Sequence, residues 1–174
     1  GLVGSEMCIR DSANALLPEG IQSVTGIFTR YAGKNNDTWQ ILIRTIDDVQ
    51  LLKGTEQCPY TVKEALKLIN DGKTTGAMVY TEGVICSEPK VNLQYGDAEF
   101  YISVDGKGMN ADGTGDPANT IKVYRNHYLN NEKYTEANKD LIKKGQKVVI
   151  CGKLILFQGT TPEIDKENYI VSIK

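Results

Sequence analysis

Metal ligands and long apolar runs are both scarce in this sequence. It contains one histidine, His127, and four cysteines, which form no C-x-x-C pair. A structural zinc site takes four thiolate or imidazole ligands, usually in two close pairs, so the sequence predicts no zinc site. No apolar run reaches the roughly 18 residues that span a membrane, and no signal-peptide pattern is visible. We therefore expect no membrane-spanning segment.

An excess of one charge sign is missing as well. Lys and Arg number 20 and Asp and Glu number 22, for a formal net charge of -2. Nucleic-acid binding gains affinity when basic groups neutralise phosphates, so this balance argues against tight binding but leaves room for a local basic groove. The 174 residues, 40% hydrophobic and 24% charged, are typical of a globular protein. That length holds one domain of about 100–120 residues and a smaller piece.

Known catalytic motifs are also absent. The sequence has no G-x-S-x-G, no H-E-x-x-H, no Walker loop and no dinucleotide-binding glycine pattern. His127, in "YRNHYLNN", has no nucleophile near it in the sequence, so we interpret it as a surface histidine. We predict that the protein is not an enzyme and uses no cofactor.

Residues 1–12, "GLVGSEMCIRDS", have no helical or strand periodicity. Their "SEMCIRDS" resembles a translated sequencing adapter, a contaminant at the ends of metagenomic gene sequences, so we expect this segment to be non-native. A disordered natural terminus is the alternative. In both cases residues 1–12 are excluded from the predicted fold.

The sequence does contain an internal repeat. "VTGIFTRYAG" (24–33) and "ICGKLILFQG" (150–159) share apolar and glycine positions at a constant offset of 126 residues. Residues 13–53 predict a β-hairpin, whose two strands alone are marginally stable in water. We therefore expect a remnant of a preceding domain of the same kind as the one that follows. The alternative is a genuine N-terminal hairpin that docks on the main domain.

Residues 54–60 are predicted to be a linker, followed by a helix. Thr61 and Glu64 match a capping box, and Gly72 stands where a helix would end, so we expect a helix over 61–72. Its apolar residues recur at helical spacing, which gives it one face to lay on a sheet.

Five strand patterns follow the helix and complete a predicted domain over residues 61–174. They lie at 77–88, 98–104, 119–125, 146–157 and 168–173. Alternate residues from Ala98 to Val104 are expected to face the core, and Gly83 is expected to mark a bulge or a bend where the sheet coils. A polar, helical segment is expected at 132–145 and a turn at 158–165. This order predicts a mainly β fold, a five-stranded Greek-key barrel of the OB type.

Several stretches within residues 77–164 resemble a known family. "EGVI", "AEFYISVDG", "KKGQKVVICGKL" and "GTTPEI" are similar to OB-fold domains of Bacteroidota secreted and surface proteins, and to OB domains associated with extracellular nucleases. The N-terminal piece resembles the end of a second OB-like domain of unknown function. The resemblance implies a fragment of a multidomain extracytoplasmic protein, secreted or on the cell surface as lipoproteins are. It specifies the fold better than the ligand.

OB folds commonly bind single strands or sugars on the outer face of strands two and three. Stacking on such ligands uses exposed aromatic rings, with cations nearby when the ligand carries phosphate. The residues that meet these requirements form the predicted ligand site: Tyr101, Lys122, Tyr124, Arg125, Tyr128 and Lys153. The alternative is that tyrosines simply suit a half-buried sheet surface.

The sequence leaves two structural features undecided. Cys86 and Cys151 each end an apolar strand pattern, and we favour buried thiols over a disulfide. The loop 105–119 is rich in Gly and Asp and is interpreted as a surface loop. Because the spacing of an EF-hand is not met, the alternative is an irregular calcium site at Asp105, Asp112 and Asp116.

Three functions remain. The leading one is a non-catalytic OB-fold binding module for single-stranded nucleic acid. The second is a carbohydrate-binding module, which neutral charge and tyrosine-rich strands favour. The third is a structural spacer that packs against neighbouring domains of the same full-length protein and binds no ligand. Salt separates the first two, because phosphate binding weakens steeply with salt.

Overall fold

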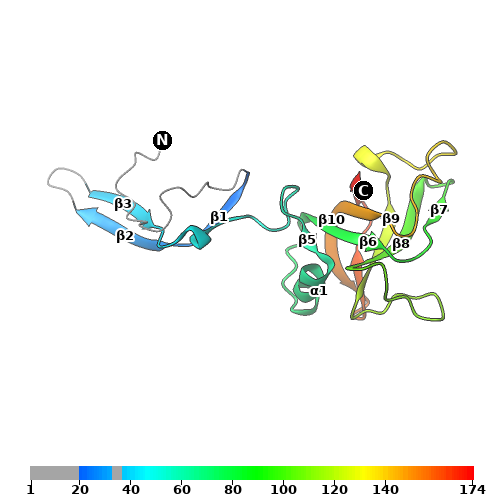
Figure 1. Ribbon diagram of the computed structural model, residues 1–174, viewed down its shortest axis with the longest axis horizontal. Coiled ribbons are helices and arrows are strands. Elements are labelled where there is room, and N and C mark those ends of the chain that lie inside the picture. The colour runs from blue at the N-terminus through cyan, green and yellow to red at the C-terminus, as the bar shows by residue number, and fades with distance from the viewer. Residues whose placement is uncertain (1–19, 33–36) are drawn as a thin grey trace. The chain divides into compact units, whose positions relative to one another are not determined.

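The computed structural model describes residues 20–32 and 37–174, so the predicted non-native segment 1–12 lies outside the described residues (Figure 1). The chain divides into two compact units, Gly1–Lys53 and Gly54–Lys174. Within the described ranges, no helix is both long and apolar enough to cross a bilayer.

The described residues of the N-terminal unit form four short strands. They are β1 (Gln22–Val24), β2 (Ile27–Ala32), β3 (Asp37–Leu42) and β4 (Val49–Leu51), with a 3-10 turn, η1 (Ile46–Asp48), before β4. β2 and β3 form the predicted hairpin, and β1 pairs with β4. β1 and β2 are separated at Thr25, whose N–H donates to the Asp48 carbonyl at 2.8 Å. The Gly26 backbone there lies directly against the Ile41 side chain.

The C-terminal unit contains one α-helix and most of the strands. Its elements are β5 (Tyr60–Thr61), α1 (Val62–Asn70), β6 (Met78–Ile85), β7 (Lys90–Asn92), β8 (Asp97–Ser103), β9 (Thr120–Asn126), η2 (Leu129–Asn131), β10 (Lys147–Phe157), β11 (Thr161–Ile164) and β12 (Tyr169–Ile173). Residues 54–60 are bonded to this unit, because the Tyr80 N–H donates to the Gly54 carbonyl and Tyr60 pairs with β6.

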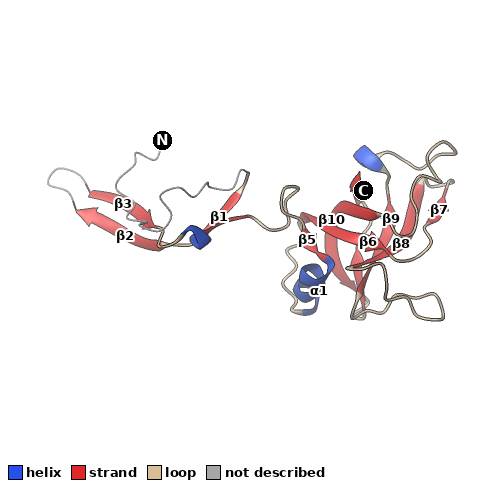
Figure 2. Cartoon of the chain, in the orientation of Figure 1, coloured by secondary structure: helices blue, strands red, loops and turns tan. Residues whose placement is uncertain are grey.

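Five of these strands close into a barrel (Figure 2). Around the barrel the order is β6, β8, β9, β11 and β10, and β10 pairs with β6 again. Neighbours are antiparallel except β9 and β11, which are parallel. β11 pairs with the second half of β10 and β12 with the first half, so β11 and β12 act as one broken strand. The predicted mainly β barrel with a preceding helix is confirmed.

Helix α1 packs against β5, β6, β8, β9 and β10, and it therefore covers one end of the barrel. It begins and ends as predicted. The Thr61 hydroxyl accepts from the Glu64 N–H at 3.3 Å, the Glu64 carboxylate accepts from the Thr61 N–H at 2.9 Å, and Gly72 has a φ of +65°. β6 and β10 pair in one register through Gly83, so a bulge, one of the two features expected there, does not occur. A Cβ there would lie 2.8 Å from Val62 Cγ2, so the glycine lets the helix approach the sheet.

Three other predictions for this unit are wrong. Residues 132–145 form turns rather than a helix, because the Tyr134 N–H donates to the Gly96 carbonyl instead of to a helical partner (Figure 2). Residues 161–164, expected in a turn, form β11 between β9 and β10. Val104 is exposed rather than buried, since β8 ends one residue before it.

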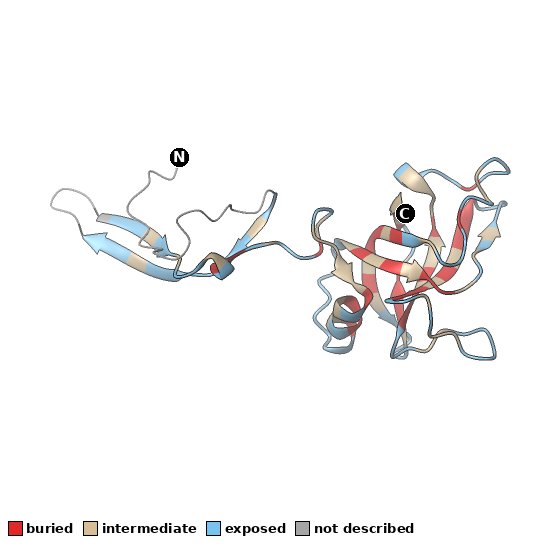
Figure 3. Ribbon diagram, viewed as in Figure 1, coloured by how far each residue is buried: buried red, intermediate tan, exposed pale blue. Residues whose placement is uncertain are grey.

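Buried residues gather inside the barrel and form its hydrophobic core (Figure 3).

A network of hydrogen-bonded polar side chains closes the end of the barrel near Tyr134. The Asn126 amide donates to Asn168 Oδ1 at 2.7 Å, and the Tyr134 hydroxyl donates to Asn126 Oδ1 at 3.1 Å. Asn168 in turn donates to the Tyr124 carbonyl at 2.7 Å. This network fixes the segment after β9 and the break between β11 and β12.

Cys86 and Cys151 are buried free thiols, as the favoured interpretation expected. Burial raises the pKa of the Cys86 thiol. Cys151 lies on the outer face of β10 but is covered by its cross-strand neighbours Tyr80 and Tyr169. Hydrogen bonding to Cys151 raises the pKa of Tyr169 to about 12.

Candidate functional site

The outer faces of β8, β9 and β11 form one continuous surface, because these strands are neighbours in the barrel. Tyr101 stands opposite Lys122, and Lys122 stands opposite Glu163. Tyr124 follows Lys122 on the same face of β9. The surface therefore contains three of the six predicted site residues, together with a carboxyl group that the sequence prediction missed.

Lys122 is compensated by two carboxylates. Its Nζ lies 3.2 Å from Glu99 Oε2 and 3.9 Å from Glu163 Oε2. The same ammonium lies 4.7 Å from the centroid of the Tyr124 ring. A cation held by two acidic groups offers little attraction to a phosphate, so this part of the surface is acidic rather than basic.

Glu163 is unusual for a charged residue on the outer face of a sheet, because only 2% of it is exposed. Burial raises the pKa of its carboxyl group above the ordinary 4.5, and Lys122 offsets part of that effect. Nearby Asp165 and Glu99 act in the same direction as burial. The surface thus contains a carboxyl group whose protonation depends on its neighbours.

Arg125 is held by residues at the beginning of β8. Tyr124 and Arg125 together oppose Glu99, which makes a bulge in β9, and Arg125 has a φ of +50°. Its Nε donates to Asp97 Oδ2 at 2.7 Å, and its guanidinium lies 5.1 Å from the centroid of the Tyr95 ring. The guanidinium is therefore paired at the beginning of β8, four residues before Tyr101.

The remaining predicted residues do not join the others. Tyr128 packs against the core, with its ring centroid 5.5 Å from that of Tyr134. Lys153 lies on β10, opposite Met78, and β11 separates that strand from β9. His127, interpreted as a surface histidine, shares a hydrogen bond of 2.8 Å with Asn131 Oδ1.

A cleft of about 350 Å³ opens beside Tyr101. This volume is at the lower end of the range of about 300–1,000 Å³ for ligand pockets. The walls come from β8, β9, the loop before β9 and the turn into β11, and no lining side chain carries a formal charge at neutral pH. Its polar side chains are Tyr101, Asn110, Thr114, Thr120, Thr160 and Thr161.

The loop between β8 and β9 is ordered where it forms a wall of the cleft. Met109 and Gly115 make a β-bridge, and the Asn110 N–H donates to the Thr114 carbonyl at 2.8 Å. A Cβ at Gly115 would collide with the Tyr101 ring, so glycine at this position lets the loop backbone lie against that ring. The loop thereby fixes one side of the aromatic group.

The three aspartates of this loop are used in local turns. Asp105 Oδ1 accepts from the Lys107 N–H, and Asp116 Oδ1 accepts from the Ala118 N–H. The Thr114 hydroxyl bond lowers the pKa of Asp112. Within residues 20–32 and 37–174, no group of three or more His, Cys, Asp or Glu is arranged to hold a metal ion. These carboxylates therefore stabilise the local turns of the loop.

No family model matches this chain, and no curated protein matches it either. The chemistry of the site is therefore judged from its own geometry.

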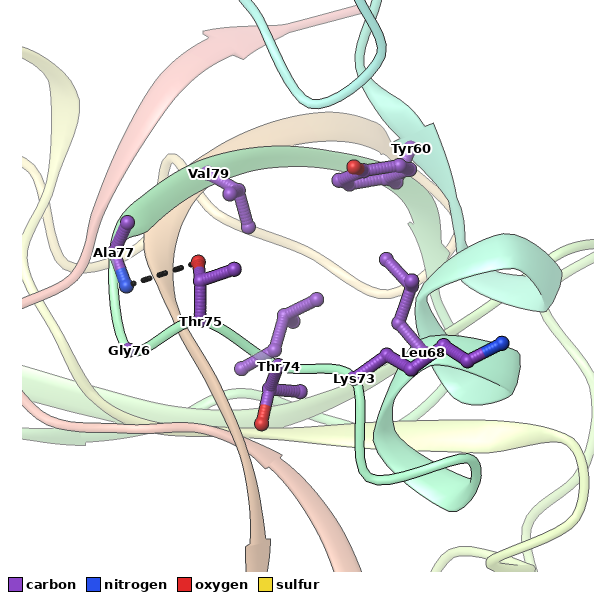
Figure 4. Close-up of a pocket in the computed structure, with 9 residues that line it drawn as sticks. Tyr60, Leu68, Lys73, Thr74, Thr75, Gly76, Ala77 and Val79 are labelled. Atoms are coloured by element: carbon purple, nitrogen blue, oxygen red, sulfur yellow. Dashed lines mark hydrogen bonds between the residues drawn. The ribbon is translucent and has the colours of Figure 1, made fainter.

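A second hollow lies between α1, β6 and the segment that joins them (Figure 4). Its volume is about 50 Å³, and Tyr60, Leu68 and Val79 line it. Figure 4 shows the Lys73 ammonium pointing away from this space. A hollow this small holds a water molecule or two rather than an organic ligand, so the cleft beside Tyr101 is the stronger candidate.

Sequence reasoning missed Glu163 and the threonines of the turn into β11. These residues lie in a stretch that was predicted to be a turn outside the barrel. A strand pattern in "TTPEI" is hidden by its short length and by Pro162, a residue that normally demotes a strand prediction.

Proposed function

We propose that the C-terminal unit is an OB-type barrel. Three consecutive antiparallel strands, β6, β8 and β9, are followed by β10, which returns beside β6. This order supports a Greek-key arrangement, in which a fourth strand returns beside the first. The parallel contact between β9 and β11 then closes the barrel, and helix α1 covers one end. The resemblance to Bacteroidota OB domains, and the extracytoplasmic setting it implies, belong to the same proposal.

The proposed activity is non-catalytic binding of a neutral carbohydrate in the cleft beside Tyr101. One observation carries this proposal: the cleft combines an aromatic ring with hydroxyl and amide groups and has no charged side chain. Sugars present hydroxyl groups and apolar ring faces, which suit this combination. A phosphodiester ligand would need cations, and the nearby Lys122 and Arg125 are each paired with carboxylates.

Titration of the full chain with a panel of neutral oligosaccharides tests the proposal. Saturable binding that is the same at low and high salt is expected. Tyr101→Ala is expected to weaken it about tenfold, or about 1.4 kcal/mol. Tyr95→Ala is the matched control, since Tyr95 is exposed and does not line the cleft.

A labelled oligothymidine in the same assay addresses the nucleic-acid alternative. Tight, salt-sensitive binding of this probe that Tyr101→Ala removes would contradict the carbohydrate proposal in favour of nucleic acid. If neither probe class binds, the spacer interpretation replaces both.

A further inference from the structure

The N-terminal unit repeats the last three strands of the barrel. Pairing of Val24 with Val49 corresponds to that of Ile150 with Ile170. Two more cross-strand pairs of the N-terminal unit have counterparts in the barrel. In each case the first residue of the pair lies 126 positions before its counterpart. Phe28 with Ile41 corresponds to Leu154 with Ile164, and Tyr31 with Thr38 corresponds to Phe157 with Thr161. Thus β1 and β2 together correspond to β10, β3 to β11, and β4 to β12.

A glycine contact supports the same correspondence. A Cβ at Gly26 would collide with Ile41 Cγ2, and a Cβ at Gly152 would collide with Ile164 Cγ2. These are equivalent residues in the two units. A buried polar residue also precedes the last strand of each unit, Asp48 before β4 and Asn168 before β12. The two units therefore share backbone packing as well as strand pairing.

The two units differ in what covers the equivalent side chains. Ile150, Leu154 and Ile164 are 0%, 4% and 1% exposed in the barrel. Their counterparts in the N-terminal unit, which are Val24, Phe28 and Ile41, are 47%, 67% and 57% exposed. In Figure 3, β2 and β3 are coloured as largely exposed. Trp39 lies on this same face, where its ring stacks on Phe28 with centroids 5.1 Å apart.

We propose that this apolar face binds a three-stranded antiparallel β-segment equivalent to β6, β8 and β9. The barrel shows what covers the face in this strand arrangement, because β6 pairs with the outer edge of β10 and β9 with the outer edge of β11. The edge of β10 that β6 occupies corresponds to that of β1, and the edge of β11 that β9 occupies corresponds to that of β3; among the described residues no strand lies on either edge. The partner is thus a polypeptide whose alternate strand residues are apolar, as in β8.

The part of the chain that the structure describes contains no free segment of this kind. Its own β6, β8 and β9 are already paired in the closed barrel. A second copy would offer a face of the same strands rather than the missing ones, so we place the partner outside this sequence.

A grafted chain tests the proposal with the protein's own strands. In this graft, residues 54–146 are joined directly before Ile21. Strands β6, β8 and β9 then come before β1 in the chain, just as they come before β10 in the native barrel. The single tryptophan, Trp39, reports the outcome, since it is 64% exposed in the native chain. We expect its emission to shift to shorter wavelength and its quenching by acrylamide to fall several-fold. Phe28→Leu in the graft relieves overpacking, because leucine occupies the equivalent position in β10.

Two matched variants of the graft distinguish the apolar face of β2 from its opposite face. Phe28→Asp is expected to return Trp39 to its exposed state. Ile27→Lys is expected to leave it covered, because the equivalent residue in the barrel is Lys153. Persistent exposure of Trp39 in both the graft and its Phe28→Leu form would overturn the proposal. Sedimentation of the native chain provides the second test, since a dimer that buries Trp39 would show that a second copy is the partner.

Discussion

At the scale of single residues, the buried carboxyl of Glu163 sets a pH dependence. Its raised pKa means that the folded protein holds a proton at pH values where the unfolded chain has lost it. Stability from this group is therefore present at low pH and is lost as pH rises from about 4.5 through the raised pKa. Glu163→Gln is expected to raise the midpoint of thermal unfolding by a few degrees at pH 7, and the gain should shrink toward pH 4.5.

Glu88→Gln is the control for this change, because Glu88 is exposed. It should alter the midpoint little at any pH in the range. A Glu163→Gln protein that is less stable than the native chain at pH 7 would mean that attraction to Lys122 outweighs the cost of burial. Midpoints measured by calorimetry across the pH range decide between these outcomes.

The identity of the site residues could be read only partly from the sequence. Tyr101, Lys122 and Tyr124 were predicted from strand alternation, which is local and which fixes the face that a side chain points to. Pairing of Lys122 with Glu163 depends on the parallel contact between β9 and β11. Residues 41 positions apart in sequence cannot be matched by periodicity, so the loss of the free cation was not foreseen.

At the scale of elements, local chemistry made helix α1 predictable. Its capping box and terminal glycine lie within twelve residues, whereas β11 is defined by neighbours that are far away in sequence. The segment 132–145 shows the opposite case. Its composition suits a helix, but the hydrogen bonds of Tyr134 to Gly96 and Asn126 hold it in an irregular path.

The cap of α1 should matter to the whole barrel, because this helix covers one of its ends. Thr61→Ala removes the hydroxyl that accepts from the Glu64 N–H. We expect a loss of about 1 kcal/mol in the free energy of unfolding, as for other N-caps. Lys63→Ala, on the exposed side of the same helix, should change it little. Equal values for the two variants in urea unfolding would contradict a stabilising cap.

At the scale of the molecule, the two units differ in how completely each buries its own apolar side chains. The barrel closes its own sheet and buries a continuous core, whereas the N-terminal unit leaves large apolar side chains exposed. The internal repeat was visible in the sequence because glycine and apolar spacing survive in both copies. Which face of the repeat lacks cover could be identified only from the side-chain exposures of the two units.

Removal of residues 1–53 should therefore leave the barrel folded. A closed barrel has no open sheet edge that needs residues from outside it, so calorimetry should give the same midpoint for residues 54–174 as for the barrel transition of the full chain. Removal of residues 1–60 is the matched control. It also deletes Gly54 and Tyr60, which bond to β6, and should cost about 1–3 kcal/mol. Loss of cooperative unfolding in residues 54–174 would instead show that the N-terminal unit is an integral part of the barrel.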